Sequence, residues 1–408
     1  MDYIIERSDA VSIKEKKNWL LIYGRRKVGK TFLLRELCKF GNYYTVKKDL
    51  NIITEDRVLT VNEGLEEIKK LLSENKRVVL DEFQRLNEST LEELSVLHPK
   101  GQLIISGSSL RIVKKIFEPQ SPLLGFFMPM KIGFIRPSDA IRGVQASDFE
   151  KRIELATFLR EPWIIPLYNK EKIDEYLYEI ISKSRYTITA LMGEIFTEEE
   201  RELTKKYEAI ISLIGSGTWN TKQITALLYG KRLIPDPSPT HVIQYLKNLE
   251  EMEIVESIKL HKAKGRYYRL TSPIMNIYYY MESRYDISSR PISLDEMRPT
   301  LEKLMHLEIQ NFIADLFAEL YDGRKEYSVS PDKEVDFIIS KRNKSEIIGE
   351  VKWKKVSQED LNKFIKNTER LQGKRILICK SGEIKDQNVE VLNAKQVVEQ
   401  VLEVKKSA

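Results

Sequence analysis

The stretch that decides the fold is YGRRKVGKT, Tyr23 to Thr31. It follows the apolar and aromatic run Trp19 to Tyr23, and it combines four basic residues with two glycines and a threonine. The spacing Gly24-x4-Gly29-Lys30-Thr31 is typical of a phosphate-binding loop. In such loops glycines let backbone N–H groups turn inward, the lysine reaches the phosphates and the threonine ligates Mg²⁺. The alternative is a basic strand-to-helix turn without a ligand.

Two further strand ends support a nucleotide site. RVVLDEFQRL reads as an apolar strand that ends in Asp81 and Glu82, where the first carboxylate would hold Mg²⁺ and the second would act on the attacking water. QLIISGSSL ends in a run of serines, which we expect either to sense the γ-phosphate through Ser108 or to form a plain turn. The predicted nucleotide contacts are Gly24, Arg25, Arg26, Lys27, Val28, Gly29, Lys30, Thr31, Phe32, Asp81 and Ser108, with Thr31 and Asp81 as metal ligands and Glu82 as a catalytic residue.

Composition indicates several folded domains. The 408 residues are 42% hydrophobic and 31% charged, with a net charge of +6 that permits nucleic-acid binding. No apolar run approaches the roughly 18 residues that a membrane helix needs, so we expect a cytoplasmic protein without a membrane partner. Cys38 and Cys379 lie far apart among apolar neighbours, which favours buried thiols over a disulfide or a zinc site.

The middle of the chain predicts two helical modules. Residues 138–200 alternate apolar and charged residues at helical spacing, which indicates a lid over the nucleotide, with Arg160 and Arg185 as candidates to reach it; a helical spacer is the alternative. Residues 201–290 read as three helices and a hairpin, the order of a winged helix. Its wing carries the cations Lys259, Lys262, Lys264, Arg266 and Arg269, which favours DNA binding over a protein-interaction role.

Residues 298–408 read as a long helix, three strands, a helix and a strand, the order of restriction-endonuclease-like folds. Asp336 lies in one apolar strand, and Glu350 and Lys352 lie on one face of the next. We predict that Asp336, Glu350 and Lys352 are catalytic, and that Asp336, Glu350 and Glu308 from the preceding helix ligate Mg²⁺ or Mn²⁺. Glu-x-Lys is frequent in this Lys/Glu-rich chain, and a buried ion pair without chemistry is the alternative.

Together, YGRRKVGKT, VVLDEFQRL, LIISGSS and SPLLGFFMPMKIGFI resemble the archaeal ATPase family of P-loop proteins over roughly residues 1–280. That resemblance implies ATP as the ligand. The family has a Gly-Arg pair after its SPL, whereas this chain has Gly125-Phe126-Phe127. An arginine that stabilises the transferred phosphoryl group must then come from Arg111, Arg136 or a neighbouring copy in a homo-oligomer, or hydrolysis is slow.

Residues 298–390 resemble the C-terminal domain often fused to these ATPases, which is similar to the PD-(D/E)XK nuclease superfamily. The sequence thus predicts an α/β multidomain chain: a P-loop parallel-sheet ATPase core (1–137), a helical lid (138–200), a winged helix (201–290) and a restriction-endonuclease-like α/β domain (298–408). The expected function is Mg²⁺-dependent ATP hydrolysis with DNA binding and DNA cleavage. The rival is a nucleotide-switched DNA- or protein-binding regulator with an inactive nuclease-like domain.

Overall fold

The computed structural model describes residues 4–95, 100–108, 110–168, 172–183, 185–199, 201–328 and 335–404. The chain packs as two compact units. The P-loop unit comprises Glu6–Ile135 and Ala190–Glu202, and the larger unit comprises Met1–Ile5, Arg136–Thr189 and Leu203–Ala408. Packing therefore does not separate residues 201–290 from 298–408, and the finer division into four domains stays a prediction.

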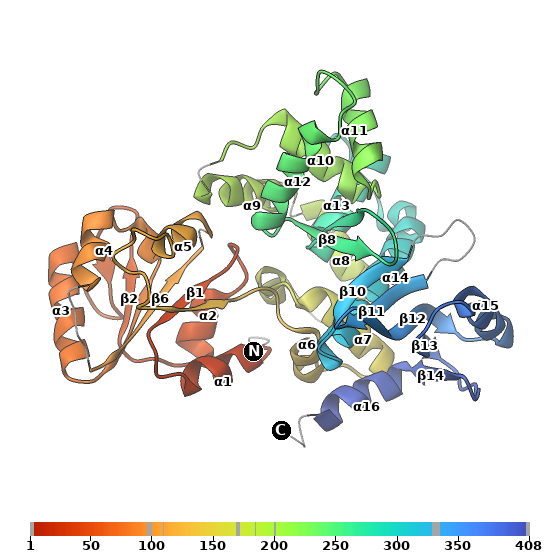
Figure 1. Ribbon diagram of the computed structural model, residues 1–408, viewed down its shortest axis with the longest axis horizontal. Coiled ribbons are helices and arrows are strands. Elements are labelled where there is room, and N and C mark those ends of the chain that lie inside the picture. The colour runs from red at the N-terminus through yellow and green to blue at the C-terminus, as the bar shows by residue number, and fades with distance from the viewer. Residues whose placement is uncertain are drawn as a thin grey trace. The chain divides into compact units, whose positions relative to one another are not determined.

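The P-loop unit is built on a seven-stranded sheet in the order β4-β3-β2-β5-β6-β1-β7 (Figure 1). The strands β2, β5, β6, β1 and β7 run parallel, and β3 and β4 add an antiparallel edge. Its elements are α1 (Ser8–Glu15), β1 (Leu20–Tyr23), α2 (Lys30–Phe32), η1 (Leu33–Leu37), β2 (Tyr43–Val46), β3 (Ile52–Ile53), β4 (Val58–Leu59), α3 (Val61–Ser73), β5 (Arg77–Asp81), η2 (Phe83–Arg85), α4 (Glu88–Ser95), β6 (Gln102–Gly107), α5 (Leu110–Ile116) and β7 (Met128–Lys131).

Both faces of this sheet are covered, as its apolar strands require. On one face, Leu65, Ile68 and Leu72 of α3 pack on Val78 and Leu80 of β5. On the other face, residues of α1 and η1 pack on the alternate strand residues, among them Leu20, Ile22, Val79 and Ile104. The parallel register brings the carboxyl ends of β1, β5 and β6 to one edge, where Asp81 pairs with Ser106 and Tyr23 with Gly107. Ligands of open α/β sheets bind at that edge.

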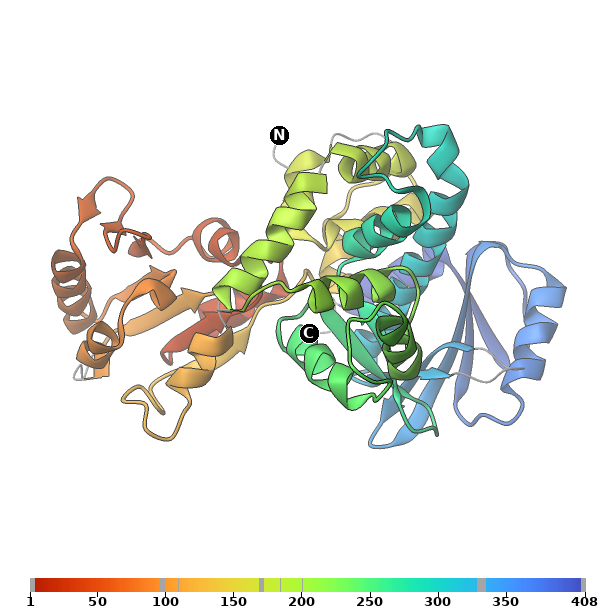
Figure 2. The same cartoon turned by 90° about the horizontal axis from the view of Figure 1, so that it is seen from above.

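The larger unit contains a second seven-stranded sheet in the order β14-β13-β12-β11-β10-β8-β9, with helices around it (Figure 2). Its elements are α6 (Pro137–Gly143), α7 (Phe149–Leu159), η3 (Pro162–Leu167), α8 (Ile173–Lys183), α9 (Arg185–Glu198, whose second half belongs to the P-loop unit), α10 (Lys205–Gly215), α11 (Thr221–Gly230), α12 (Thr240–Glu251), β8 (Val255–Leu260), β9 (Arg266–Leu270), α13 (Pro273–Tyr285), α14 (Leu294–Leu320), β10 (Arg324–Ser328), β11 (Val335–Lys341), β12 (Lys344–Lys355), α15 (Gln358–Thr368), β13 (Lys374–Ser381), β14 (Val389–Asn393) and α16 (Ala394–Val404).

The sheet of the larger unit is continuous across the predicted domain boundary. The hairpin β8–β9, predicted as the wing of a winged helix, is part of this sheet, because β8 pairs in parallel with β10 through Glu326 opposite Lys259 and Tyr327 opposite Leu260. Helix α14 also begins earlier than predicted, because Ser293 caps it by accepting a hydrogen bond from Glu296 N, and it runs through Pro299. Among the described helices, none has a stretch both long and apolar enough for a bilayer.

Candidate functional site

The loop after β1 has the backbone that the phosphate-binding pattern requires. Gly24 follows β1 with φ of 154°, and a Cβ there would lie 1.9 Å from the carbonyl oxygen of Ile132, so only glycine fits. Gly29 has φ of 84° and precedes Lys30, the first residue of α2. These two positions fix the loop between strand and helix, with the N-terminus of α2 facing the carboxyl edge of the sheet.

Four side chains lie at the floor of this loop. Lys30 is buried, and its Nζ donates hydrogen bonds to the carbonyl oxygens of Gly24 (2.7 Å) and Arg25 (3.1 Å). Thr31 Oγ1 donates to Asp81 Oδ2 at 2.8 Å, and Tyr43 Oη donates to the same oxygen at 2.7 Å. Burial, and then Asp81, raises the pKa of Tyr43 well above its ordinary value, so this hydroxyl stays a donor to Asp81. The structure therefore joins Thr31 and Asp81, the two predicted metal ligands.

A buried arginine outside the motif holds the loop in place. Arg7 donates from Nη1 to the carbonyl oxygen of Val28 (2.9 Å) and from Nη2 to that of Gly133 (3.0 Å), while Asp9 balances its charge at 2.6 Å. Sequence reasoning missed Arg7, because the contact joins residues 21 positions apart and Arg7 itself belongs to no recognised pattern. Arg25 is also buried, and its guanidinium lies 4.8 Å from the ring centre of Phe134.

Glu82 is half-buried beside Asp81. It adopts a left-handed backbone with φ of 59°, and its carboxylate pairs with Arg85 at 2.8 Å and accepts from Gln84 Nε2 at 3.0 Å. Gln84 Nε2 also donates to Ser108 Oγ at 3.2 Å, which links the ends of β5 and β6. Burial raises the pKa of Glu82 above its ordinary value, against the opposing effect of Arg85. Gln84 Oε1 is buried without a hydrogen-bond partner among the described residues, and Ser109 lies outside them.

The second half of α9 places carboxylates on the loop. Arg26 pairs with Glu194 at 2.6 Å and with Glu198 at 2.5 Å, and Glu199 accepts from the backbone N–H of Leu110 at 2.7 Å. Glu198 also contributes to the raised pKa of Glu82. The predicted lid region thus contacts the loop through acidic residues, whereas the residues predicted to reach the nucleotide are Arg160 and Arg185. In this arrangement Arg26 is engaged by protein carboxylates that would compete with a bound phosphate.

Neutralising these acids should strengthen nucleotide binding. The double variant Glu194→Gln/Glu198→Gln releases Arg26 and removes negative charge near the phosphate position, so we expect the Kd for ATP to fall by about threefold to tenfold. Titration calorimetry would measure it, with Glu36→Gln, an exposed acid of the same unit, as the control. An unchanged or weaker affinity of the double variant would contradict this role for α9.

The described contacts account for two of the positions considered for an arginine near the nucleotide. Phe126 and Phe127, where the resembled family has its arginine, pack on Trp19 with ring centres 6.0 and 5.3 Å away. Arg160 is not available as expected, because it pairs with Asp315 inside the larger unit at 2.7 Å. Arg136 belongs to the larger unit, and the side chains of Arg111 and Arg185 lie outside the described residues.

In the larger unit, Asp336, Glu350 and Lys352 come together on β11 and β12. Lys352 Nζ lies 2.6 Å from Glu350 Oε1, and the nearby carboxylates of Glu350 and Asp336 raise the pKa of Lys352 although burial opposes them. Asp336 Oδ2 accepts from the backbone N–H of Val351 at 2.7 Å. Gln310 of α14, which sequence reasoning missed, donates to Asp336 Oδ2 (3.4 Å) and to the carbonyl oxygen of Val351 (3.2 Å). Glu350 Oε2 is buried and has no hydrogen-bond partner among the described residues.

Glu308 is not brought to this group. It is buried, and it accepts from Asn276 Nδ2 at 3.0 Å. Residues two apart on a helix point about 200° apart, so Gln310 and not Glu308 turns toward Asp336. Within the described ranges no three His, Cys, Asp or Glu side chains are grouped as a metal site, and the expected third carboxylate is therefore lacking. Burial raises the pKa of Glu308 to about 7, against the effects of Arg269, Asn276 and Asn311.

The variant Glu308→Gln should become more stable relative to wild type as the pH rises. In the unfolded chain Glu308 loses its proton near its ordinary pKa of 4.5, whereas in the folded chain it keeps the proton to about 7, so wild type loses stability across this range. Glutamine cannot ionise, and the difference between variant and wild type should grow by about 2 to 3 kcal/mol from pH 5 to pH 8. Denaturant unfolding at both pH values measures it, and a difference that does not change would contradict the assignment.

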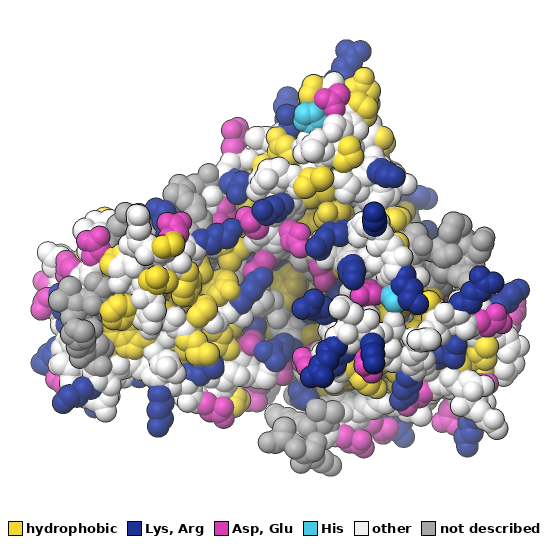
Figure 3. Space-filling model, viewed as in Figure 1, with side chains coloured by type: hydrophobic (Ala, Val, Ile, Leu, Met, Phe, Trp, Pro, Cys, Tyr) yellow, Lys and Arg dark blue, Asp and Glu magenta, His cyan; other side chains and the backbone are white. Residues whose placement is uncertain are grey.

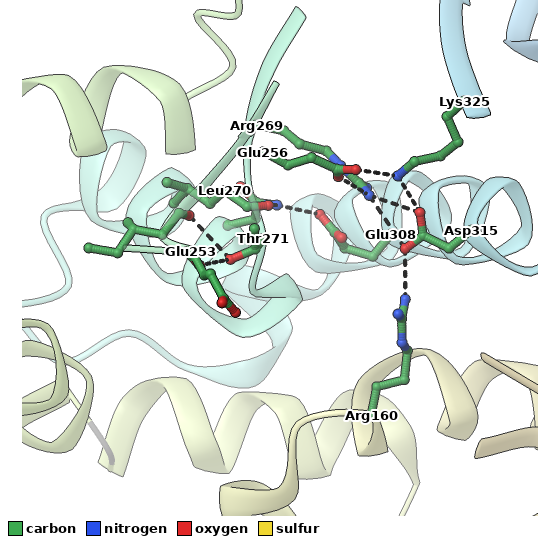
Figure 4. Close-up of polar contacts among 11 residues, drawn as sticks. Arg160, Glu253, Glu256, Arg269, Leu270, Thr271, Glu308, Asp315 and Lys325 are labelled. Carbon is green, nitrogen blue, oxygen red and sulfur yellow. Dashed lines mark hydrogen bonds and ion pairs between the residues drawn. The ribbon is translucent and has the colours of Figure 1, made fainter. Parts of the chain in front are cut away.

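Arg269 is not available for DNA contact as the wing prediction assumed. It is buried in an ion cluster, where it pairs with Glu256 (2.8 Å) and Asp315 (3.3 Å). Lys325 forms ion pairs with Glu256, at 2.8 Å, and with Asp315. Asp315 also forms an ion pair with Arg160 (Figure 4). Arg269 therefore points toward Asp315 of α14. The other wing cations, Lys259, Lys262, Lys264 and Arg266, are exposed.

Comparison with known proteins agrees with the P-loop geometry. Residues 16–125 match the family model described as an AAA domain. A Walker-type ATPase of Pyrococcus abyssi is 16% identical, and the match covers 68% of this chain and 96% of that one with a TM-score of 0.50. The ORC2 protein of Aeropyrum pernix is 13% identical, with 75% of this chain and 94% of that one covered and a TM-score of 0.39. No curated protein matches the chain. Residues 16–125 are therefore similar to an AAA domain, and the chain shares the parallel-sheet P-loop fold of that Walker-type ATPase.

Proposed function

We propose that the chain binds ATP with Mg²⁺ and hydrolyses it at the loop between β1 and α2. The observation that carries this proposal is the hydrogen bond from Thr31 to Asp81, beside the buried ammonium of Lys30. A hydroxyl and a carboxylate are oxygen ligands that Mg²⁺ accepts, and both stand at the carboxyl edge of the parallel sheet. This donor set therefore fits a magnesium nucleotide.

Each group has a defined role in this proposal. The backbone N–H groups from Arg25 to Lys30 bind the phosphates, and the Lys30 ammonium leaves the loop carbonyls to contact the terminal phosphates. Thr31 and Asp81 would hold Mg²⁺, which supplies positive charge to the phosphate oxygens when bound. Glu82 orients the attacking water and accepts its proton, while Gln84 and Ser108 lie beside it to report the terminal phosphate.

The test is ATP binding and hydrolysis by Lys30→Ala. The ammonium is the buried cation of the loop floor, so its loss should weaken ATP binding and reduce hydrolysis to background. Lys70→Ala removes an exposed cation of α3 in the same unit and should leave both intact. Hydrolysis by Lys30→Ala at the wild-type rate would overturn the proposal.

We further propose that residues 201–290 act as a winged helix that binds DNA. The supporting features are the helices α10, α11 and α12 followed by the hairpin β8–β9, and the exposed cations Lys259, Lys262, Lys264 and Arg266 on that hairpin. Lys and Arg side chains gather over the strands β8 and β10 in the space-filling view (Figure 3). Cations of this kind bind the phosphate backbone without reading sequence.

Finally, we propose that Asp336, Glu350 and Lys352 cleave the bound DNA. Two acids and a lysine meet at one end of paired strands, and the partnerless Glu350 Oε2 is an oxygen that a divalent cation would satisfy. Asp336 and Glu350 would hold Mg²⁺ or Mn²⁺, which polarises the phosphate when bound. Lys352 orients the attacking water and stabilises the charge that develops on the phosphate. In this proposal ATP binding at the P-loop gates access to the nuclease site.

A further inference from the structure

A cavity of about 660 Å³ lies in the larger unit between the β9 hairpin strand, α13 and α14. Its size is within the range of pockets that hold small organic ligands. The helices and hairpin of residues 201–290 form one side, and α14 forms the other. Neither the P-loop chemistry nor the acids of β11 and β12 account for this cavity.

The walls of the cavity have two chemical characters. Trp219, Tyr267 and Tyr280 line it with aromatic rings, and Trp219 stacks on Tyr267 with ring centres 5.6 Å apart and planes inclined by 27°. The ring centres of Tyr267 and Tyr327 lie 4.3 Å apart, so Tyr327 of β10 packs on the aromatic residues of the cavity. Rigid aromatic faces are the surfaces on which proteins stack nucleobases.

Polar residues of the lining come from α13 and α14. Asn276 and Asn311 hold the carboxyl of Glu308 in this lining, with Asn276 Nδ2 donating to Glu308 Oε1 at 3.0 Å. Asn276 Nδ2 also donates to the carbonyl oxygen of Leu270 at 3.2 Å, so the amide oxygen is the group of this side chain that can accept a hydrogen bond from the edge of a base. Lys303 is exposed where α14 lines the cavity and can contact a phosphate outside it.

Gln310 connects this cavity to the nuclease-like group. It lines the cavity, and its Nε2 also donates to Asp336 Oδ2 and to the carbonyl oxygen of Val351. A nucleotide whose base entered the cavity would therefore have its backbone next to Asp336, Glu350 and Lys352. A paired base inside a duplex cannot enter such a cavity, because both of its faces are stacked.

We propose that this cavity binds one unpaired nucleobase and thereby directs the nuclease-like site to DNA with a flap or frayed end. The inference rests on the proposed DNA-binding function, since it names the kind of DNA that the site accepts. The base stacks on Trp219, which packs on Tyr267, and the amide oxygens of Asn276 and Asn311 accept hydrogen bonds from its edge. Selectivity then comes from the base itself and not from the phosphate backbone.

The test compares two DNA duplexes by fluorescence anisotropy without a divalent cation, so that binding is measured apart from cleavage. Both carry a one-nucleotide flap, which bears thymine in one duplex and an abasic residue in the other. Wild type should bind the thymine flap about 10-fold more tightly, since stacking of one base is worth roughly that factor or more. Trp219→Ala should bind both duplexes equally, and Trp219→Phe, which keeps an aromatic face, should retain part of the preference.

The control is Tyr229→Ala, which removes an exposed aromatic residue of α11 outside the cavity and should keep the full preference. Equal binding of both duplexes by wild type would overturn the base pocket while leaving DNA binding intact. A preference that persists in a folded Trp219→Ala protein would also overturn it. Failure of wild type to bind either duplex would instead refute the proposed DNA-binding function on which the pocket rests.

Discussion

Asp315→Ala is expected to lower the free energy of unfolding of the larger unit by about 3 to 5 kcal/mol, the range measured when one partner of a buried ion pair is removed. Asp315 is the common acceptor of three cations, Arg160 from the end of α7, Arg269 from β9 and Lys325 from β10. When the Asp315 carboxylate is removed, Arg269 and Lys325 keep their ion pairs with Glu256. Arg160 loses its ion pair with Asp315.

The effect is expected to be large because the cluster joins segments distant in sequence. It ties the hairpin to α14 and to the first strand of the nuclease-like region (Figure 4). Although burial opposes it, the three cations hold the pKa of Asp315 well below its ordinary value of 3.8. The contribution of Asp315 is therefore present above that pH and is lost as the pH falls below it.

Denaturant unfolding at neutral pH measures this prediction. The matched control is Asp295→Ala, which removes an exposed acid of the same helix that pairs with Arg298 at the surface. It should change the unfolding free energy little. A loss of less than 1 kcal/mol for Asp315→Ala would mean that the cluster is structurally dispensable.

Glu82→Gln is expected to reduce the rate of ATP hydrolysis by about 10² to 10⁴, the usual contribution of a general base, while ATP binding persists. Glu82 follows Asp81 at the carboxyl edge of the sheet, and burial raises its pKa, which makes it a better base for a water proton. Glutamine keeps the shape and the contact with Arg85 but cannot accept the proton.

Single-turnover hydrolysis and calorimetric ATP binding separate the two effects. Glu66→Gln, an exposed acid on α3, serves as the control and should behave as wild type. If Glu82→Gln hydrolysed ATP within about threefold of wild type, which is far less than a general base supplies, another group would have to activate the water. If it lost ATP binding instead, Glu82 would be a structural residue.

The nucleotide site is predictable from sequence because its parts are local. The glycines, Lys30 and Thr31 lie within one loop, and Asp81 ends an apolar strand whose neighbours in a parallel sheet end at the same edge. The residues that complete the site come from elsewhere. Arg7, which precedes α1, donates a hydrogen bond to the loop, and Glu194 and Glu198 of α9 pair with Arg26. No local sequence pattern predicts these contacts.

The larger unit was less predictable for the same reason. Strand β8 joins β10 in parallel across some 60 residues of intervening chain, and such pairing has no local sequence signature. That pairing, together with α14, buries Arg269 in the ion cluster and sets Gln310 beside Asp336. The errors at Arg269 and Glu308 both concern which face of a strand or helix is covered, which depends on tertiary packing.

The central claim, a nuclease gated by ATP, is tested most directly by DNA cleavage. Supercoiled, linear and branched DNA would be incubated with Mg²⁺ or Mn²⁺, with and without ATP, using wild type, Lys352→Ala and Lys30→Ala. We expect cutting that Lys352→Ala abolishes and that responds to ATP in wild type but not in Lys30→Ala. No cutting of any substrate by a wild-type protein that still hydrolyses ATP would contradict it, and would leave a nucleotide-switched regulator with an inactive nuclease-like domain.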